Sequence, residues 1–304
     1  MLLHDFRHGV RLLARQPALT AVAVVSLAIG VGANATLVSL VDGLGLRPLP
    51  IDRADRLVRI FTSRPPNAFG DSSFADYRDI ARQTDAFERI AAYGTRGAAV
   101  TAPDGSSEVA ILGVVSGTYF ETVGVRASTG RTLTERDDTE SELPVAMISD
   151  RLWERKYQRD ASIAGREIII NRHSVILAGV VPAAFSGLEP FLAPDIWVAT
   201  GAVPSLLGTR AELDARDNRW FRIVARLRDG RTIGEAAGQV QAVMASLARE
   251  HPATNVGRGG SVSLERAYRE RAGRAAGLIF GAAGLCVLLM ACANVAGLLL
   301  ARGE

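Results

Sequence analysis

Residues 275–301, AAGLIFGAAGLCVLLMACANVAGLLLA, contain no charged side chain, and neither do residues 18–41, ALTAVAVVSLAIGVGANATLVSLV. A helix needs about 20 residues to cross the hydrocarbon core of a bilayer. Soluble cores rarely contain uncharged runs of this length. We therefore expect two transmembrane helices, one at residues 18–41 and one at residues 275–301.

The first apolar stretch also fits a cleaved signal peptide. Arg7, Arg11 and Arg15 precede it, and residues 33–35, Ala-Asn-Ala, form a small–x–small cleavage site. Because apolar residues continue as far as Val41, we favour an uncleaved anchor, with cleavage as the alternative. Both interpretations place the following domain outside the cytoplasm. The three arginines orient the N-terminus inward, the central domain outward and the C-terminus inward.

Residues 42–274 form a mixed-charge segment that is large enough for one or two hydrophobic cores. The whole chain of 304 residues carries 35 Lys+Arg and 32 Asp+Glu, a net charge of +3 that does not indicate nucleic-acid binding. An apolar fraction of 48% excludes wholesale disorder. Cys286 and Cys292 both lie in the second apolar stretch, six residues apart, so the exported domain is predicted to contain no disulfide.

The N-terminal residues 1–17 predict an amphipathic helix in the cytoplasmic membrane interface. Leu3, Phe6, Val10 and Leu13 recur at three- and four-residue spacing, with basic residues around them. A solvated basic leader is the alternative.

Within the central segment, alternating periodicities predict an α+β domain. Strands are expected at residues 57–62, 109–115, 145–149, 196–199, 221–227 and 261–266, with a hairpin formed by residues 167–170 and 175–181. Helices are expected from a Ser72 or Ser73 cap to residue 83, at residues 151–157 behind an Asp150 cap, and at residues 233–250 behind a Thr232–Glu235 capping box.

Strand–helix–strand patterns thus occur twice, near residues 57–115 and near residues 221–266. We expect a discontinuous α+β lobe, at about residues 50–115 and 217–267. A β-rich insert at about residues 116–216 interrupts it.

Motifs for chemistry are missing from the sequence. There is no G-x-x-x-x-G-K-[ST] phosphate loop and no G-x-S-x-G nucleophile elbow. His4, His8, His173 and His251 are too scattered to make a metal site. We therefore predict no catalytic, cofactor or metal residues and expect that the chain is not an enzyme.

Both apolar stretches carry small residues and amides on possible packing faces. Such residues favour helix packing against protein as well as lipid. The candidates are Gly30, Gly32 and Asn34 in the first stretch, and Gly277, Gly281 and Asn294 in the second.

An ordered set of short motifs resembles a known family. They are residues 6–13 (FRHGVRLL), 17–20 (PALT), 28–34 (AIGVGAN), 46–50 (LRPLP), 56–59 (RLVR), 115–120 (VSGTYF), 148–153 (ISDRLW), 179–185 (GVVPAAF), 195–198 (DIWV) and 288–302 (LLMACANVAGLLLAR). The chain is similar to the MacB/FtsX-type ABC transporter permeases, especially the duplicated group first noted in acidobacteria.

The resemblance implies a MacB-like periplasmic core domain at residues 42–274 between two helices, in the bacterial cytoplasmic (inner) membrane. It also implies a separate cytoplasmic ABC ATPase that binds ATP, other permease helices or a second permease copy, and a periplasmic adaptor. Family permeases continue into a cytoplasmic segment and two more helices. We therefore expect residues 302–304 to be the truncated cytoplasmic end of an N-terminal portion.

The leading hypothesis is a non-catalytic permease subunit that couples a partner's ATP cycle to movement outside the membrane, for efflux or mechanotransmission. One alternative is a structural or regulatory membrane protein that signals to envelope partners without transport. Another is a single-anchor exported binding protein.

Overall fold

A computed structural model of the chain describes residues 21, 24–25, 28–32, 35, 51, 53–101, 105–189, 192–208 and 210–300, without the side chains of residues 291 and 294–300. The chain forms two compact units, Met1–Arg47 with Arg269–Glu304, and Pro48–Tyr268. The predicted interfacial helix at residues 1–17, Asn34 and residues 302–304 lie outside the described residues.

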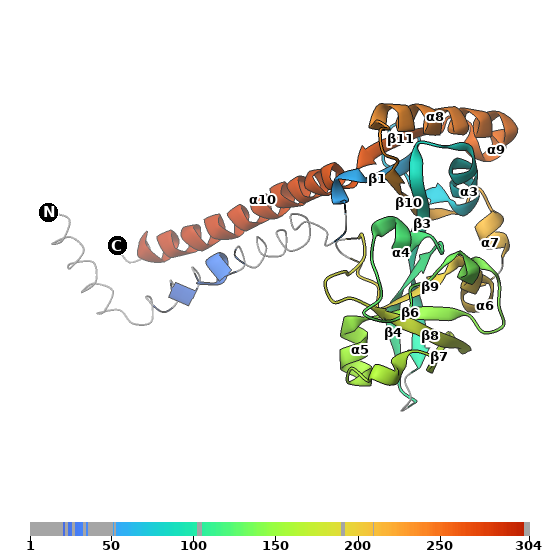
Figure 1. The fold of residues 1–304 in the computed structure, drawn as a ribbon. Coiled ribbons are helices and arrows are strands. Elements are labelled where there is room, and N and C mark those ends of the chain that lie inside the picture. Colours follow the sequence, from blue (N-terminus) through green and yellow to red (C-terminus); the bar gives the residue numbers. More distant parts are fainter. Residues whose placement is uncertain are drawn as a thin grey trace. The chain divides into compact units, whose positions relative to one another are not determined.

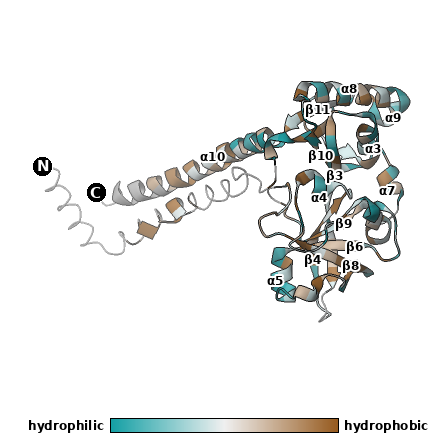
Figure 2. Ribbon diagram, viewed as in Figure 1, coloured by the Kyte–Doolittle hydropathy of each residue, from teal (hydrophilic) through white to brown (hydrophobic). Residues whose placement is uncertain are grey.

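In the first unit, the described residues between 21 and 35 are helical, and helix α10 (Glu265–Leu300) contributes its residues from Arg269 onward. Among the described residues, α10 meets the length and apolarity of a membrane-spanning helix, because an 18-residue window within its segment Glu265–Met290 has a mean hydropathy of 1.8. Along its length α10 changes from hydrophilic to hydrophobic (Figure 2). The helix begins ten residues before the predicted span, so the predicted strand at residues 261–266 is wrong for Glu265 and Arg266.

The second unit contains two interleaved strand–helix–strand units (Figure 1). The first consists of β1 (Leu57–Ser63), α3 (Phe74–Gln83) and β3 (Phe87–Thr101); the second consists of β10 (Arg219–Leu227), α8 (Ile233–Glu250) and β11 (Gly259–Leu264). The strands lie in the order β11-β1-β10-β3 and every neighbouring pair is antiparallel. This is a split βαβ arrangement, so neither unit forms a sheet without the other.

A ring of six strands forms a barrel beside this lobe. Its pairings run from β3 to β4 (Ser107–Val115), β9 (Ile196–Ala199), β6 (Val145–Ser149), β8 (His173–Val181) and β7 (Glu167–Ile170), and from β7 back to β3. Each of these strands therefore has a neighbour on both sides over part of its length. β4, which the sequence analysis assigns to the lobe, is one of the barrel strands.

Strand β3 belongs to both parts. Residues 87–93 pair with β10, and residues 93–101 pair with β4, so the partner changes at Tyr93. The sequence analysis missed this strand, because Gly94, Gly97 and the alanines around them interrupt the apolar alternation that indicates a strand.

Short elements complete the domain. They are η2 (Ala54–Arg56), β2 (Ser72–Ser73), α4 (Tyr119–Val123), β5 (Thr129–Gly130), η3 (Glu135–Asp138), α5 (Asp150–Tyr157), η4 (Ala161–Ile163), η5 (Thr200–Ala202), α6 (Val203–Leu207), α7 (Ala211–Asp214) and α9 (Pro252–Asn255).

Hydrophobic residues cover both faces of the lobe sheet. Along β1, Val58 and Ile60 join one core cluster, which also contains α3, α8 and the barrel interior, while Leu57 joins a second cluster with α4. Successive side chains of a strand point to opposite faces. A strand buried on both faces therefore reads as an apolar run, which in residues 57–61 of β1 is interrupted by Arg59.

Most predicted elements agree with the structure. Ser73 caps α3 by accepting a hydrogen bond from the Asp76 amide, and Thr232 and Glu235 form the capping box of α8. The predicted Asp150 cap is wrong. Ser149 caps α5, accepting from the Leu152 amide, because its β-region backbone precedes the first helical turn.

Burial raises the pKa of four tyrosines, Tyr77, Tyr93, Tyr119 and Tyr157. An unfolded tyrosine ionises near pH 10, so folding favours the neutral phenols and stability falls as the pH rises above about 10. We expect tyrosinate absorbance to rise together with the loss of far-UV circular dichroism. Ionisation of these tyrosines near pH 10 with an unchanged dichroism spectrum would contradict their burial.

Candidate functional site

The first residue of α10 lies inside the domain. Glu265 is 1% exposed, and its carboxylate meets the guanidinium of Arg59 from the middle of β1, which is also 1% exposed. Arg59 donates two hydrogen bonds to this carboxylate, one from Nε and one from Nη2 to Oε1 at 3.1 Å. A two-pronged arginine–carboxylate pair fixes orientation as well as distance. The pair therefore holds the start of α10 against β1.

A second carboxylate contacts the same guanidinium. Glu189, in the connection between β8 and β9, places Oε1 3.1 Å from Arg59 Nη1, and Arg59 Nη2 donates to the Leu188 carbonyl at 3.2 Å. Burial opposes the arginine charge, but Tyr93, Glu265 and Glu189 outweigh it and raise the pKa of Arg59 above its ordinary value. Arg59 thus stays charged in the core and joins three separate chain segments.

Aromatic rings enclose this arginine. Its guanidinium carbon lies 4.4 Å from the ring centre of Tyr268, in the first turn of α10, and 5.7 Å from that of Tyr93. Phe61, two residues along β1 from Arg59, packs on Tyr268 with ring centres 5.3 Å apart. Cation–π contacts gain strength where water is excluded. We call Arg59, Glu265, Glu189, Tyr93 and Tyr268 the helix-base site.

The ion pairs of the helix-base site fix one geometry of α10 on β1 but add little net stability to the domain. A buried ion pair contributes little net stability, yet removing one partner costs about 3–5 kcal/mol because a charge stays buried alone. Displacing Glu265 from Arg59 is therefore unfavourable. The site can fix the position of α10 relative to β1 and transmit a displacement from one to the other. It contains no nucleophile–base pair, and the described residues contain no group of three or more possible metal ligands.

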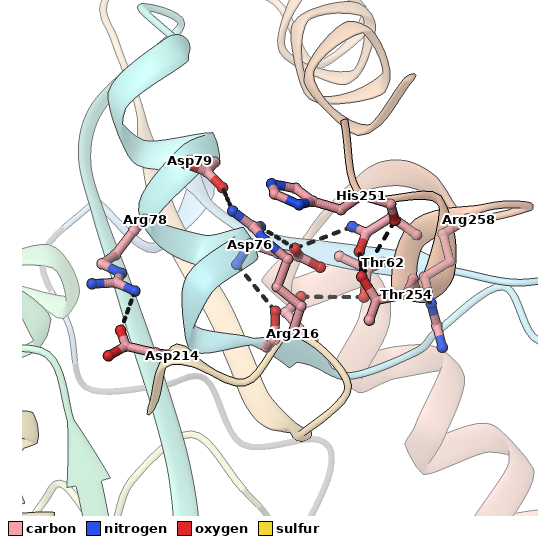
Figure 3. Close-up of polar contacts among 12 residues, drawn as sticks. Thr62, Asp76, Arg78, Asp79, Asp214, Arg216, His251, Thr254 and Arg258 are labelled. Carbon is pink, nitrogen blue, oxygen red and sulfur yellow. Dashed lines mark hydrogen bonds and ion pairs between the residues drawn. The ribbon is translucent and has the colours of Figure 1, made fainter. Parts of the chain in front are cut away.

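A second buried network joins α3 to the region before β10 (Figure 3). Asp76 is fully buried and accepts from Arg216 at 2.8 Å, from Arg219 at 2.6 Å and from the Asn255 amide at 3.1 Å. Arg216 also pairs with Asp79 at 2.6 Å. We call these residues the Asp76 network; it links α3, α9 and the start of β10.

Sequence reasoning missed both networks. A signal for the first exists, because Arg59 is a lone charge inside the apolar strand residues 57–61 and a charge there needs a partner. The partners Glu265 and Glu189 lie 206 and 130 positions away in the chain, and no local pattern identifies them.

The predicted packing residues lie elsewhere. Gly30 and Gly32 fall in the described helical residues and Gly277 and Gly281 in α10, while Asn34 and the side chain of Asn294 lie outside the described part. Apart from the chain neighbours and the backbone of its own helix, a Cβ atom built on Gly32 or Gly281 would meet no atom of the described residues within 4 Å. Their role in helix packing stays a prediction.

Comparisons with known proteins agree on one kind of domain. A family model described as the MacB-like periplasmic core domain matches residues 20–243. The periplasmic region of MacB from Actinobacillus actinomycetemcomitans superposes with a TM-score of 0.52 at 13% identity, covering 72% of this chain and 92% of that one. A domain of a putative permease from Porphyromonas gingivalis gives 0.52 at 14% identity, covering 70% and 92%. Curated proteins give no significant match.

The Asp76 network yields a stability prediction. Asp76→Asn removes the buried counter-charge of Arg219 and one of the two carboxylates that pair with Arg216, so we expect it to lower the free energy of unfolding by about 3–5 kcal/mol. The matched control is Asp214→Asn, which breaks the Arg78–Asp214 pair, whose side chains are 35% and 51% exposed. Exposed pairs contribute about 0–1 kcal/mol. Urea unfolding of the detergent-solubilised chain measures both; equal effects would contradict the assignment.

Proposed function

The chain belongs to the MacB-like periplasmic core domain family, and on that premise we propose that it is a non-catalytic subunit of an ABC permease. Its extracytoplasmic domain moves with its membrane helices, and a separate cytoplasmic ABC ATPase supplies the energy. The likeness in fold to the periplasmic region of MacB supports this role. The absence of a phosphate-loop motif from the sequence is consistent with a separate ATPase.

The observation that carries the proposal is the buried start of α10. Glu265 is buried against Arg59, the half-buried Tyr268 packs over the same arginine, and the helix continues into an apolar segment suited to a bilayer. A continuous helix transmits displacement along its axis because its backbone hydrogen bonds run from turn to turn. A shift of α10 therefore acts directly on β1.

We place the chain in the bacterial cytoplasmic membrane with its N-terminus inside and residues 42–274 outside. The arginines at positions 7, 11 and 15 support this orientation. A structural or regulatory membrane protein that signals without transport is the second candidate, because the helix-base site serves force transmission equally well.

The test is reconstitution. The affinity-tagged chain is purified in detergent, an ABC ATPase that co-purifies is identified, and both enter liposomes for measurement of ATP hydrolysis. We expect the chain to stimulate ATP hydrolysis several-fold. Glu265→Gln should abolish most of this stimulation, because α10 is then no longer anchored to β1.

The control is Asp229→Asn, which removes a surface carboxylate (84% exposed) that pairs with Arg56, the residue before the start of β1. This variant should stimulate like the wild type. If no ABC ATPase co-purifies, or if the chain does not alter hydrolysis, the permease proposal is wrong.

A further inference from the structure

Helix α10 contacts one side of the Arg59 guanidinium, and the connection between β8 and β9 contacts the other. Glu189 and the Leu188 carbonyl bind it there, at 3.1 Å and 3.2 Å. Arg59 is therefore an element that both contacts share, and a change at Glu265 can reach Glu189 through it.

We propose that residues 185–189, the relay segment, pass the state of the Arg59–Glu265 pair from the lobe to the barrel. This inference rests on the proposed function, because it names the route by which movement of α10 would reach the distal part of the domain. Glu189 acts here as a positioning residue, and Tyr93 is its partner on β3.

Tyr93 lies where lobe and barrel join. Its hydroxyl donates to Glu189 Oε1 at 3.0 Å, the same oxygen that faces Arg59. Its backbone pairs with Arg222 of β10 and with Val115 of β4, at the point where β3 changes partner. Movement of the Glu189 carboxylate therefore displaces Tyr93 at the point where β3 changes partner.

The relay segment is packed tightly enough to transmit a shift. Leu188 is 1% exposed, and its backbone is hydrogen-bonded with buried Tyr119 of α4. Phe185 packs on the ring of Tyr119 with centres 6.4 Å apart. Close-packed interiors deform little and pass strain on. The segment therefore couples Arg59 to α4 as well as to β3.

The segment also lies close to residues that flank two barrel strands. It follows β8, which ends at Val181, and Pro194 leads into β9. Gly187 has a φ of +97°, which favours glycine, and a Cβ atom there would lie 3.2 Å from the Pro194 ring. A displacement of the segment thus acts beside two strands of the barrel wall, β8 and β9, which β6 separates.

Hydrogen–deuterium exchange of the full detergent-solubilised chain, read by mass spectrometry, tests the relay. In Glu265→Gln, the guanidinium loses one of its two counter-charges and the fixed orientation that Glu265 gives it, so its contacts with Glu189 and Leu188 weaken. We expect at least about threefold faster exchange in peptides covering residues 185–189 and residues 92–95, because local opening free energies fall there.

The matched control removes a carboxylate from the other network. Arg216, like Arg59, contacts two carboxylates, and Asp79→Asn takes one of them away while Asp76 stays. Exchange in the relay segment should be unchanged in this variant. The reciprocal variant Glu189→Gln should speed exchange in the first turn of α10, since coupling between two sites is mutual.

Two results overturn the relay. One is faster exchange in Glu265→Gln confined to β1 and the first turn of α10; the other is a uniform rise over all peptides, which reports global destabilisation. Either outcome leaves the permease proposal standing, because ATPase stimulation through α10 and β1 does not require the relay segment. Conversely, failure to find an ATPase partner leaves the exchange result intact.

Discussion

A single buried charge organises this domain. The guanidinium of Arg59, in the middle of an apolar strand, cannot stay charged in the core without anionic partners. Glu265 at the start of α10 and Glu189 in the β8–β9 connection supply them. Three segments that are remote in sequence must therefore meet at one point. The place where α10 begins is set by this requirement, together with the ring of Tyr268 stacked on the same arginine.

Four of the segments that carry the family resemblance lie around this point. Residues 56–59 supply Arg59, residues 115–120 supply Tyr119 and Phe120, residues 179–185 supply Phe185, and residues 195–198 supply Trp197. Tyr119 packs on Phe185, and Phe120 packs on Trp197 with ring centres 6.3 Å apart. All four aromatic side chains belong to the second core cluster. The motifs therefore define a packed region behind the helix-base site instead of a set of reactive groups.

Local signals predicted the local parts of the fold. The capping box of Thr232 and Glu235, the Ser73 cap and the apolar run of β1 depend on residues a few positions apart, and the structure confirms them. The sequence analysis missed strand β3 because Gly94 and Gly97 interrupt its apolar alternation. Its pairing with strands on both sides holds it in place. The sequence shows Arg59 as a charge in need of a partner, but only the fold identifies that partner.

The interleaved topology explains why the candidate site depends on the whole domain. β1 lies between β10 and β11, so the strand that carries Arg59 is held on both edges by segments more than 150 residues away. Glu265 directly follows β11, which pairs with β1. The register of that pairing, Arg59 opposite Ser263, therefore brings the first turn of α10 to the arginine.

A double-mutant cycle on Arg59 and Glu265 tests the central claim most directly. The free energies of unfolding of Arg59→Met, Glu265→Gln and the double variant are measured by urea titration of the full chain. We predict a coupling energy of about 1.5 kcal/mol or more, as expected for buried charges in direct contact. Additive effects, within about 0.5 kcal/mol, would show that the two residues act independently and that α10 is not anchored through this pair.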